Sequence, residues 1–165
     1  MLLFKDWSNN PRNIKGRLIM IGFRLSHIAT KNQILFFLLV PQLVIYRIVV
    51  EWFLGVELPY KTVIKGGLTL FHGQALVVND GTIIGSNCIL RHSTTIGTKV
   101  LADGSYSRCP VLGDNVDVGA NVCIIGDISI GNNVKIGAGS VVVKNVPDNS
   151  VIVGNPARII RTFAP

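Results

Sequence analysis

The chain has 165 residues, 48% of them hydrophobic and only 15% charged, and its formal net charge is +7. This length suits one domain with a small appendage. The basic excess could favour nucleic acid, phosphorylated cofactors or an anionic membrane surface. Because the sequence contains no nucleic-acid-binding motif and no interleaving of aromatic and basic residues, we expect no nucleic-acid partner.

The three cysteines, Cys88, Cys109 and Cys123, are an odd number without metal-ligand spacing. We therefore expect no metal site, and a reducing cytoplasm is the simplest compartment for the protein. The N-terminus lacks a basic segment followed by an apolar run and a small-residue cleavage site. A cleavable signal peptide is therefore not expected.

Residues 1–55 are predicted to form a helical cap. Residues 1–10 look like a loose start. Apolar residues then recur at helical spacing through 12–31, among five basic residues, which predicts an amphipathic helix. A second helix is expected over 33–54, with Pro41 as a kink or break and Gly55 as its stop. Such a cap would cover the open end of the repeat structure that follows.

The apolar stretch 34–50 raises the question of a membrane. It contains Pro41, Gln42 and Arg47 and is followed by Glu51, whereas a spanning helix needs about 20 apolar residues with few charges. Residues 1–55 also carry seven Lys or Arg against two acidic residues, a net charge of +5. We expect the stretch to pack under the repeat structure, with peripheral membrane association as the alternative.

A six-residue period organises the chain from Leu112 to Val142. An aliphatic residue recurs at positions 112, 118, 124, 130, 136 and 142, and a second small or aliphatic residue follows each one after four places. This period is neither helical nor a strand alternation, and it predicts a hexapeptide β-helix. Three hexads close one triangular coil, and stacked coils form the core. The predicted fold is therefore mainly β, a parallel β-helix over 56–165 behind a short N-terminal helical cap.

Two interruptions break this period. Inward positions follow six-residue steps from Leu58 to Leu70, but the next match is Val78, so two residues are inserted just after His72. The steps continue to Ile96 and then jump to position 112, which predicts a polar loop extruded at about 98–110. Loops that leave a repeat core are often functional.

Folding three hexads into each coil predicts which residues lie side by side. With both interruptions allowed for, positions 70, 90, 118 and 136 fall on one face of successive coils. Two residues after these positions come His72, His92, Ala120 and Ala138. Neighbouring strands are about 4.8 Å apart. We therefore expect two adjacent histidines followed by two alanines, that is, a chemical site with a groove for a long thin ligand beside it.

Three segments of the repeat region resemble the serine acetyltransferase-like branch of the hexapeptide-repeat acyltransferases. They are 119–128, 136–142 and 154–159, with the sequences GANVCIIGDI, IGAGSVV and GNPARI. The chain is most similar to the short acetyltransferases of colanic-acid and capsule biosynthesis, which share the short cap and an Arg-His pair like Arg91-His92. The resemblance implies a left-handed parallel β-helix, an exception to the usual right-handed crossover. It also implies a homotrimer with acetyl-CoA bound between subunits.

The resemblance further implies the residues of the active site. The family's catalytic histidine matches His72, and its carboxylate partner matches Glu57, one carbon longer than the family's Asp. The positions that match its contacts to coenzyme A are Gly97, Thr98, Ala120, Ala138 and, near the CoA phosphates, Arg158. We expect His72 to take the proton of the acceptor hydroxyl while Glu57 fixes the tautomer of the imidazole. A backbone N–H near Gly97 or Thr98 could bind the oxyanion.

Four departures from the family argue against serine as the acceptor. Phe71 stands where serine acetyltransferases have an Asp before the catalytic His, and Arg108-Cys109-Pro110 replaces their Arg-His-Pro. Most of their long helical domain is absent, and the tail ends in Phe-Ala-Pro rather than in the Ile that docks to a partner enzyme. We expect Phe71, His92 and Arg108 to bind a different acceptor.

The sequence thus predicts an acetyl-CoA-dependent O-acetyltransferase that acts on a sugar hydroxyl in exopolysaccharide or capsule biosynthesis. Serine O-acetylation in cysteine biosynthesis is the alternative. A catalytically silent trimeric scaffold and a hexapeptide-repeat carbonic anhydrase are further candidates, although the latter needs three zinc-binding histidines and His27 falls in the cap. We expect a cytoplasmic protein, with attachment to the inner face of the membrane as an alternative.

Overall fold

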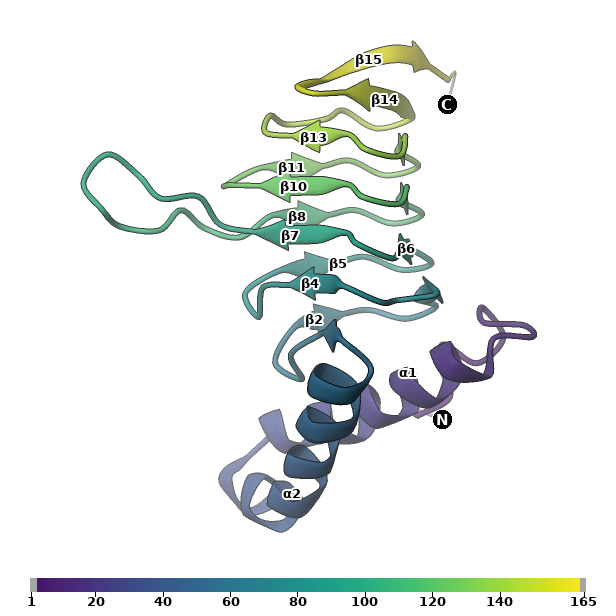
Figure 1. Ribbon diagram of the computed structural model, residues 1–165, viewed down its shortest axis with the longest axis vertical. Coiled ribbons are helices and arrows are strands. Elements are labelled where there is room, and N and C mark those ends of the chain that lie inside the picture. Colours follow the sequence, from purple (N-terminus) through teal and green to yellow (C-terminus); the bar gives the residue numbers. More distant parts are fainter. Residues whose placement is uncertain (1–2, 164–165) are drawn as a thin grey trace.

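The structure is a computed structural model and describes residues 3–163. Two helices at the N-terminal end carry a three-sided prism of short strands, and a strand hairpin closes the far end (Figure 1). Residues 1–2 of the predicted cap and residues 164–165 of the predicted β-helix lie outside the described residues.

Three sheets make the three sides of the prism. Sheet A contains β1, β4, β7, β10 and β13, sheet B contains β2, β5, β8 and β11, and sheet C contains β3, β6, β9, β12 and β14 with antiparallel β15 at its end. In chain order, the strands β1 to β15 span Val56–Glu57, Val63–Ile64, Thr69–Phe71, Leu76–Val78, Ile83–Ile84, Ile89–Arg91, Thr95–Gly97, Val111–Leu112, Asp117–Val118, Cys123–Ile125, Ser129–Ile130, Lys135–Ile136, Val141–Val142, Ser150–Gly154 and Ala157–Thr162. The predicted left-handed parallel β-helix is confirmed.

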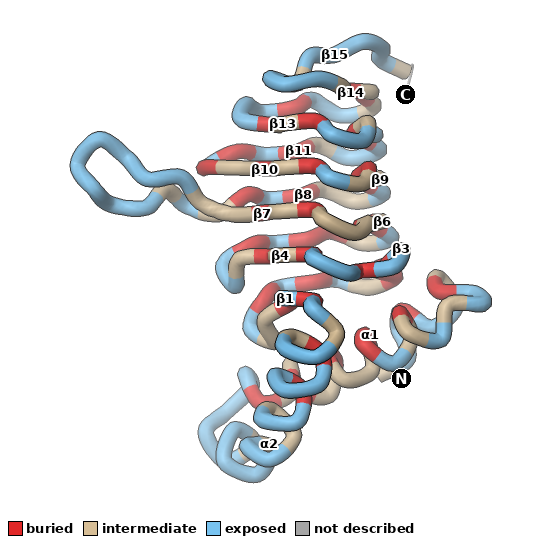
Figure 2. The backbone as a smooth tube through the Cα atoms, in the orientation of Figure 1, coloured by how far each residue is buried: buried red, intermediate tan, exposed pale blue. Residues whose placement is uncertain are grey.

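The six-residue period fills the interior of the prism. Its inward positions from Leu58 to Val142 are all buried. Equivalent positions one coil apart are in register, so that Leu70 is paired with Leu90. Figure 2 shows buried positions recurring along every coil, whereas most of α2 (Gln33–Tyr46) is exposed. Burial of each aliphatic side chain contributes roughly 1.5–3 kcal/mol, so the stacked coils supply most of the core.

Both interruptions lie where the period predicts them. Residues 72–75 form the turn between β3 and β4, and His72, Gly73 and Ala75 have positive φ angles of 66°, 65° and 54° there. The extruded loop leaves the prism between β7 and β8, where an antiparallel bridge joins Val100 to Tyr106 (Figure 1). Neither segment interrupts the stacking of the strands on either side.

One corner of the prism is held by asparagines. Asn115, Asn133 and Asn149 all have φ angles of 55–58°, a left-handed conformation that Asn tolerates better than most residues. The Asn115 amide donates to Asn133 Oδ1 at 3.0 Å, and the Asn133 amide donates to Asn149 Oδ1 at 2.8 Å. The turns between sheets B and C are thus linked from coil to coil.

The cap contains α1 (Ile14–His27), a short 3-10 turn (Ile28–Thr30), α2 and a π-helical turn (Arg47–Phe53). The predicted helices over 12–31 and 33–54 are confirmed, and Gly55 follows the second with a φ of 62°. Pro41 does not break the helix, because α2 continues through it, and the predicted kink there stays a prediction. Pro41 is exposed, so water can satisfy the carbonyl that its missing N–H would have bonded. The change to π geometry begins six residues later.

The predicted loose start at residues 1–10 is wrong for the described residues 3–10. Asp6 is buried and pairs with the buried Arg24, with Nε–Oδ2 and Nη2–Oδ1 distances of 2.8 and 3.0 Å. Asp6 Oδ1 also accepts the Leu68 N–H at 2.8 Å. Asn10 donates to the Leu68 carbonyl and accepts the Leu70 N–H, at 2.8 and 3.1 Å. These side chains satisfy the free edge of β3, which has no strand below it.

The substitution Asp6→Ala is expected to lower the free energy of unfolding by about 3–5 kcal/mol, because it leaves the Arg24 charge buried without its partner. Urea unfolding at a fixed protein concentration measures the loss. Lys65→Ala is the matched control, since Lys65 pairs with Asp114 at 3.0 Å on the surface and such pairs contribute less than about 1 kcal/mol. A loss of less than 1 kcal/mol for Asp6→Ala would contradict the role of this pair.

Candidate active site

The predicted column of residues forms at the corner where sheet C passes into sheet A. His72 follows β3 and His92 follows β6, and the two imidazole centroids are 6.0 Å apart at an interplanar angle of 69°. Together with Gln74, Ala75 and Ser93 they line a shallow depression of about 320 Å³. The period therefore correctly predicts that two histidines 20 residues apart in sequence are neighbours in space.

The two histidines differ in their surroundings. His72 is exposed and has a left-handed backbone conformation, which is uncommon for a residue other than glycine. His92 is half-buried, and its Nδ1 is buried without a hydrogen-bond partner among the described residues. A ligand that hydrogen-bonds to the His92 ring therefore has only Nε2 available.

Beside the histidine pair, Arg91 joins three neighbouring strands. Its guanidinium lies 5.5 Å from the centre of the Phe71 ring, donates to the Val118 carbonyl at 2.8 Å and pairs with Asp117. Phe71 is thus held by an arginine whose charge is already balanced by a carboxylate. Asp117 is a residue that the sequence analysis missed, and it lies one coil on from Ile89, two residues before Arg91.

Glu57 lies apart from the histidine pair. It is exposed on β1, and no hydrogen bond joins it to His72 within the described part of the chain. It instead lines a polar depression of about 440 Å³ beside the π-helical turn, together with Arg47, Glu51, Trp52, Pro59, Tyr60, Lys61 and Asp80. The pairing of Glu57 with His72 therefore stays a prediction.

The residues predicted to bind coenzyme A divide between two corners of the prism. Ala120 and Ala138 continue the column above His92, with backbone hydrogen bonds from Asn121 to His92 and from Gly139 to Ala120. Gly97 and Thr98 lie at the opposite end of sheet A, where the extruded loop begins. The strand β7, Thr95–Gly97, lies between the two corners.

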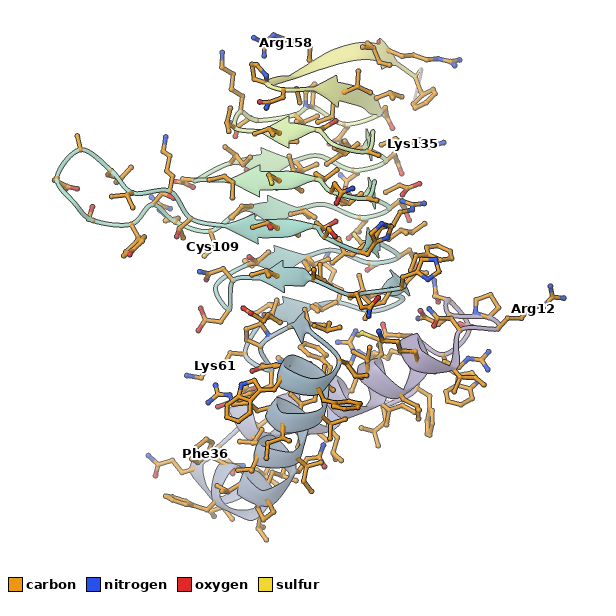
Figure 3. All side chains as sticks on the ribbon, viewed as in Figure 1. Arg12, Phe36, Lys61, Cys109, Lys135 and Arg158 are labelled. Atoms are coloured by element: carbon orange, nitrogen blue, oxygen red, sulfur yellow. The ribbon has the colours of Figure 1, made fainter. Side chains whose placement is uncertain are left out.

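The two predicted arginines are both exposed. Arg158 lies on β15 at the end of the prism farthest from the helices (Figure 3). It lines a depression of about 350 Å³ that also includes Lys144. Arg108 lies on the extruded loop, and its Nε is 3.6 Å from a carboxylate oxygen of Asp127. Two separate basic groups are thus available to anions, one at the far end and one beside the loop.

The cysteines and His27 do not add to the site. Burial and the nearby Asp80 raise the pKa of the Cys109 thiol, which disfavours the nucleophilic thiolate. His27 Nδ1 donates to the Tyr60 carbonyl at 2.7 Å, and its ring stacks on Phe23 in the cap. Among residues 3–163 no three His, Cys, Asp or Glu side chains are close enough to hold a metal ion. The zinc trio that a carbonic anhydrase requires is thus not assembled by the described residues.

Comparisons with known proteins assign the chain to a family. No family model matches it. Over 161 residues it is 37% identical to the Escherichia coli K12 protein named "Putative colanic acid biosynthesis acetyltransferase WcaB", covering 95% of this chain and 98% of that protein. The chain belongs to this acetyltransferase family.

Solved structures of serine acetyltransferases share the fold of this acetyltransferase. The soybean apoenzyme superimposes with a TM-score of 0.79 at 30% identity, covering 96% of this chain and 67% of that one. A serine acetyltransferase in complex with CoA gives a TM-score of 0.74 at 27% identity, covering 93% of this chain and 60% of that one. The predicted membership in the serine acetyltransferase-like branch is confirmed, and so is the prediction of an acetyltransferase.

Ala138→Leu tests the predicted groove for the cofactor. Ala138 is exposed, so the larger side chain should fill the groove without disturbing the core. We expect the KM for acetyl-CoA to rise about tenfold, a loss of about 1.4 kcal/mol in binding, with little change in thermal stability. Ala138→Ser is the control, because it keeps the side chain small. An unchanged KM in Ala138→Leu would place the cofactor elsewhere.

Proposed function

We propose that this acetyltransferase transfers an acetyl group from acetyl-CoA to a sugar hydroxyl in exopolysaccharide or capsule biosynthesis. The observation that carries the proposal is the pairing of His72 and His92 at the foot of a column of small residues. The relative with a colanic-acid name matches almost the full length of both chains, which supports a saccharide acceptor.

In the proposed mechanism, His72 acts as the general base. Its imidazole takes the proton of the acceptor hydroxyl as the oxygen attacks the thioester carbonyl. The tetrahedral intermediate then collapses, the carbon–sulfur bond breaks, and the proton passes from His72 to the departing thiolate of CoA. His92 is assigned to the acceptor through Nε2, because its Nδ1 is buried. Glu57 is assigned to fix the tautomer of His72, which requires a movement toward the histidine on substrate binding.

We propose that the active sites form between the subunits of a homotrimer. The assigned cofactor residues lie at two corners of one prism, so a single chain would not hold acetyl-CoA with all of them. A neighbouring copy could bring Gly97, Thr98 and Arg158 to the column of Ala120 and Ala138. The acetyl group would then lie near the histidines and the phosphates near a basic end. Arg108 and Phe71 are assigned to the acceptor side of the cleft.

We also place the protein in the cytoplasm, at the inner face of the membrane. Acetyl-CoA is a cytoplasmic metabolite, and the cap has a net charge of +5 over residues 1–55, from seven basic and two acidic side chains. Anionic lipids attract such a basic segment. The proposed reaction needs no metal, since the base and the hydrogen-bond donors come from the chain.

Serine O-acetylation is the second candidate, because the structural relatives are serine acetyltransferases. One contact disfavours it. Phe71 precedes His72 and stacks on Arg91, so this position offers no carboxylate to a serine ammonium group. Acetyl-CoA consumption measured with L-serine and with a panel of nucleotide sugars and oligosaccharides separates the two. Robust activity on serine alone would overturn the proposal.

The variant His72→Asn should lower kcat about 10²–10⁴-fold, because the acceptor hydroxyl loses its base. Asn is the suitable replacement, since it tolerates the left-handed backbone at this position. Single-turnover acetyl transfer measures the effect, and circular dichroism checks the fold. The control is Asn87→His, which places an imidazole in a similar left-handed turn at another corner and should leave kcat unchanged. Near-normal turnover of folded His72→Asn would eliminate His72 as the base.

A further inference from the structure

The helix α2 is apolar on every side, yet little of it is covered. From Gln33 to Phe53 the cap has the only helical segment in residues 3–163 that is long and apolar enough to cross a membrane, by length and composition alone. Of α2 itself only Tyr46 is buried, and side chains such as Ile34 and Phe37 are 73% and 72% exposed. An exposed apolar surface of this kind marks an interaction site.

One side of α2 forms an apolar groove of about 230 Å³, lined by Phe36, Val40, Leu43, Val44, Tyr46, Arg47, Glu51 and Tyr60. Three of these residues, Arg47, Glu51 and Tyr60, also line the polar depression around Glu57. The groove and the depression therefore adjoin. In Figure 3, Phe36 lies on the helices below the prism and Lys61 lies beside the first coil above them.

The groove along α2 and the depression around Glu57 are the apolar half and the polar half of one continuous site, and they differ in chemistry. The polar half offers the exposed carboxylates of Glu57 and Asp80 to hydroxyl donors, and an exposed Trp52 ring on which a sugar can pack. Lys61 adds one positive charge there. At the junction, Arg47 and Glu51 pair at 3.3 Å and largely cancel each other's charge. A ligand that matches both halves has a hydrocarbon chain attached to a hydroxyl-rich head.

We propose that this continuous site binds the acceptor as a lipid-linked saccharide. The hydrocarbon chain lies in the groove along α2, and the first sugar lies in the depression beside Glu57. A following sugar extends to the histidine pair, where its hydroxyl is acetylated. The inference rests on the proposed function only in taking a saccharide as the acceptor. It goes further in stating that the saccharide is attached to a lipid, and in assigning α2 to substrate binding.

Fluorescence of Trp52 can report binding directly, because Trp52 lines the polar half. The only other tryptophan is Trp7, which is replaced by Phe to keep a ring against Arg17. The probe is dodecyl maltoside below its micelle concentration. We expect saturable binding at least tenfold tighter than that of octyl maltoside and of dodecylphosphocholine, and none with maltose alone. Equal affinity for dodecylphosphocholine, or no saturable binding, would overturn the proposal.

Two adjacent positions on α2 provide a matched pair of variants. Val44 lines the groove and is 51% exposed, whereas Ile45 does not line it and is 57% exposed. Val44→Glu should weaken dodecyl maltoside binding at least tenfold, and Ile45→Glu should change it less than twofold. Equal losses of affinity in both variants would contradict binding in the groove and would indicate a general affinity of α2 for lipid surfaces. A change of oligomeric state confined to Val44→Glu, measured by light scattering, would overturn it in favour of a contact between copies.

The variant His72→Asn separates this inference from the proposed function. His72 lines neither half of the site, so the variant should bind dodecyl maltoside with unchanged affinity while acetyl transfer is lost. Loss of dodecyl maltoside binding in His72→Asn would overturn the placement of the site. Absence of acetyl transfer to every saccharide tested, with binding intact in the unmodified protein, would overturn the proposed function and leave the lipid-saccharide site standing.

Discussion

The free edge of the first coil is the constraint on which the rest of the structure depends. Every later coil has its backbone groups satisfied by the coil before it, but β3 has no strand beneath it. Asp6 and Asn10 replace that missing strand with side-chain oxygens and amides, and Arg24 holds Asp6 in place. An unpaired buried backbone group costs about as much as a lost hydrogen bond. The N-terminal segment is therefore part of the β-helix in energetic terms, although it contains no strand.

The contacts at this free edge explain why the sequence predicts the coils of the β-helix but not the structure of the N-terminal segment. The period repeats thirteen inward positions from Leu58 to Val142, all of them buried, and a repeated signal identifies the core without knowledge of distant contacts. The contact of Asp6 with Leu68 spans 62 residues and occurs once. A short polar segment such as 3–10 has the composition of a loop, and nothing local distinguishes an Asp that pairs with a buried Arg from one in water. Pro41 failed as a helix breaker for a related reason, since its effect depends on whether solvent reaches the freed carbonyl.

In the candidate site, too, the positions fixed by the repeat could be predicted from the sequence and the others could not. His72 and His92 could be paired from the sequence because both follow inward positions by two residues, and strand register then places them side by side. Glu57 follows no such rule. It occupies an outward position on another sheet and lines the depression beside the π-helical turn. The division of Gly97 and Ala120 between two corners is likewise a property of the closed triangle. The count that pairs the histidines also separates Gly97 from Ala120, but the family resemblance that assigned both to coenzyme A does not use it.

The regular repeat also limits where reactive side chains can stand. Within an uninterrupted coil, alternate residues are committed to the core and the turns favour Asn or Gly, whose backbone fits the left-handed corner. Just before the two-residue insertion, His72 itself adopts the left-handed conformation, and its side chain is exposed. His92, one coil later, lies against it without any insertion of its own. Strand register between β3 and β6 therefore suffices to bring the two imidazoles together. The same column carries only the small side chains of Ala120 and Ala138 in the next coils.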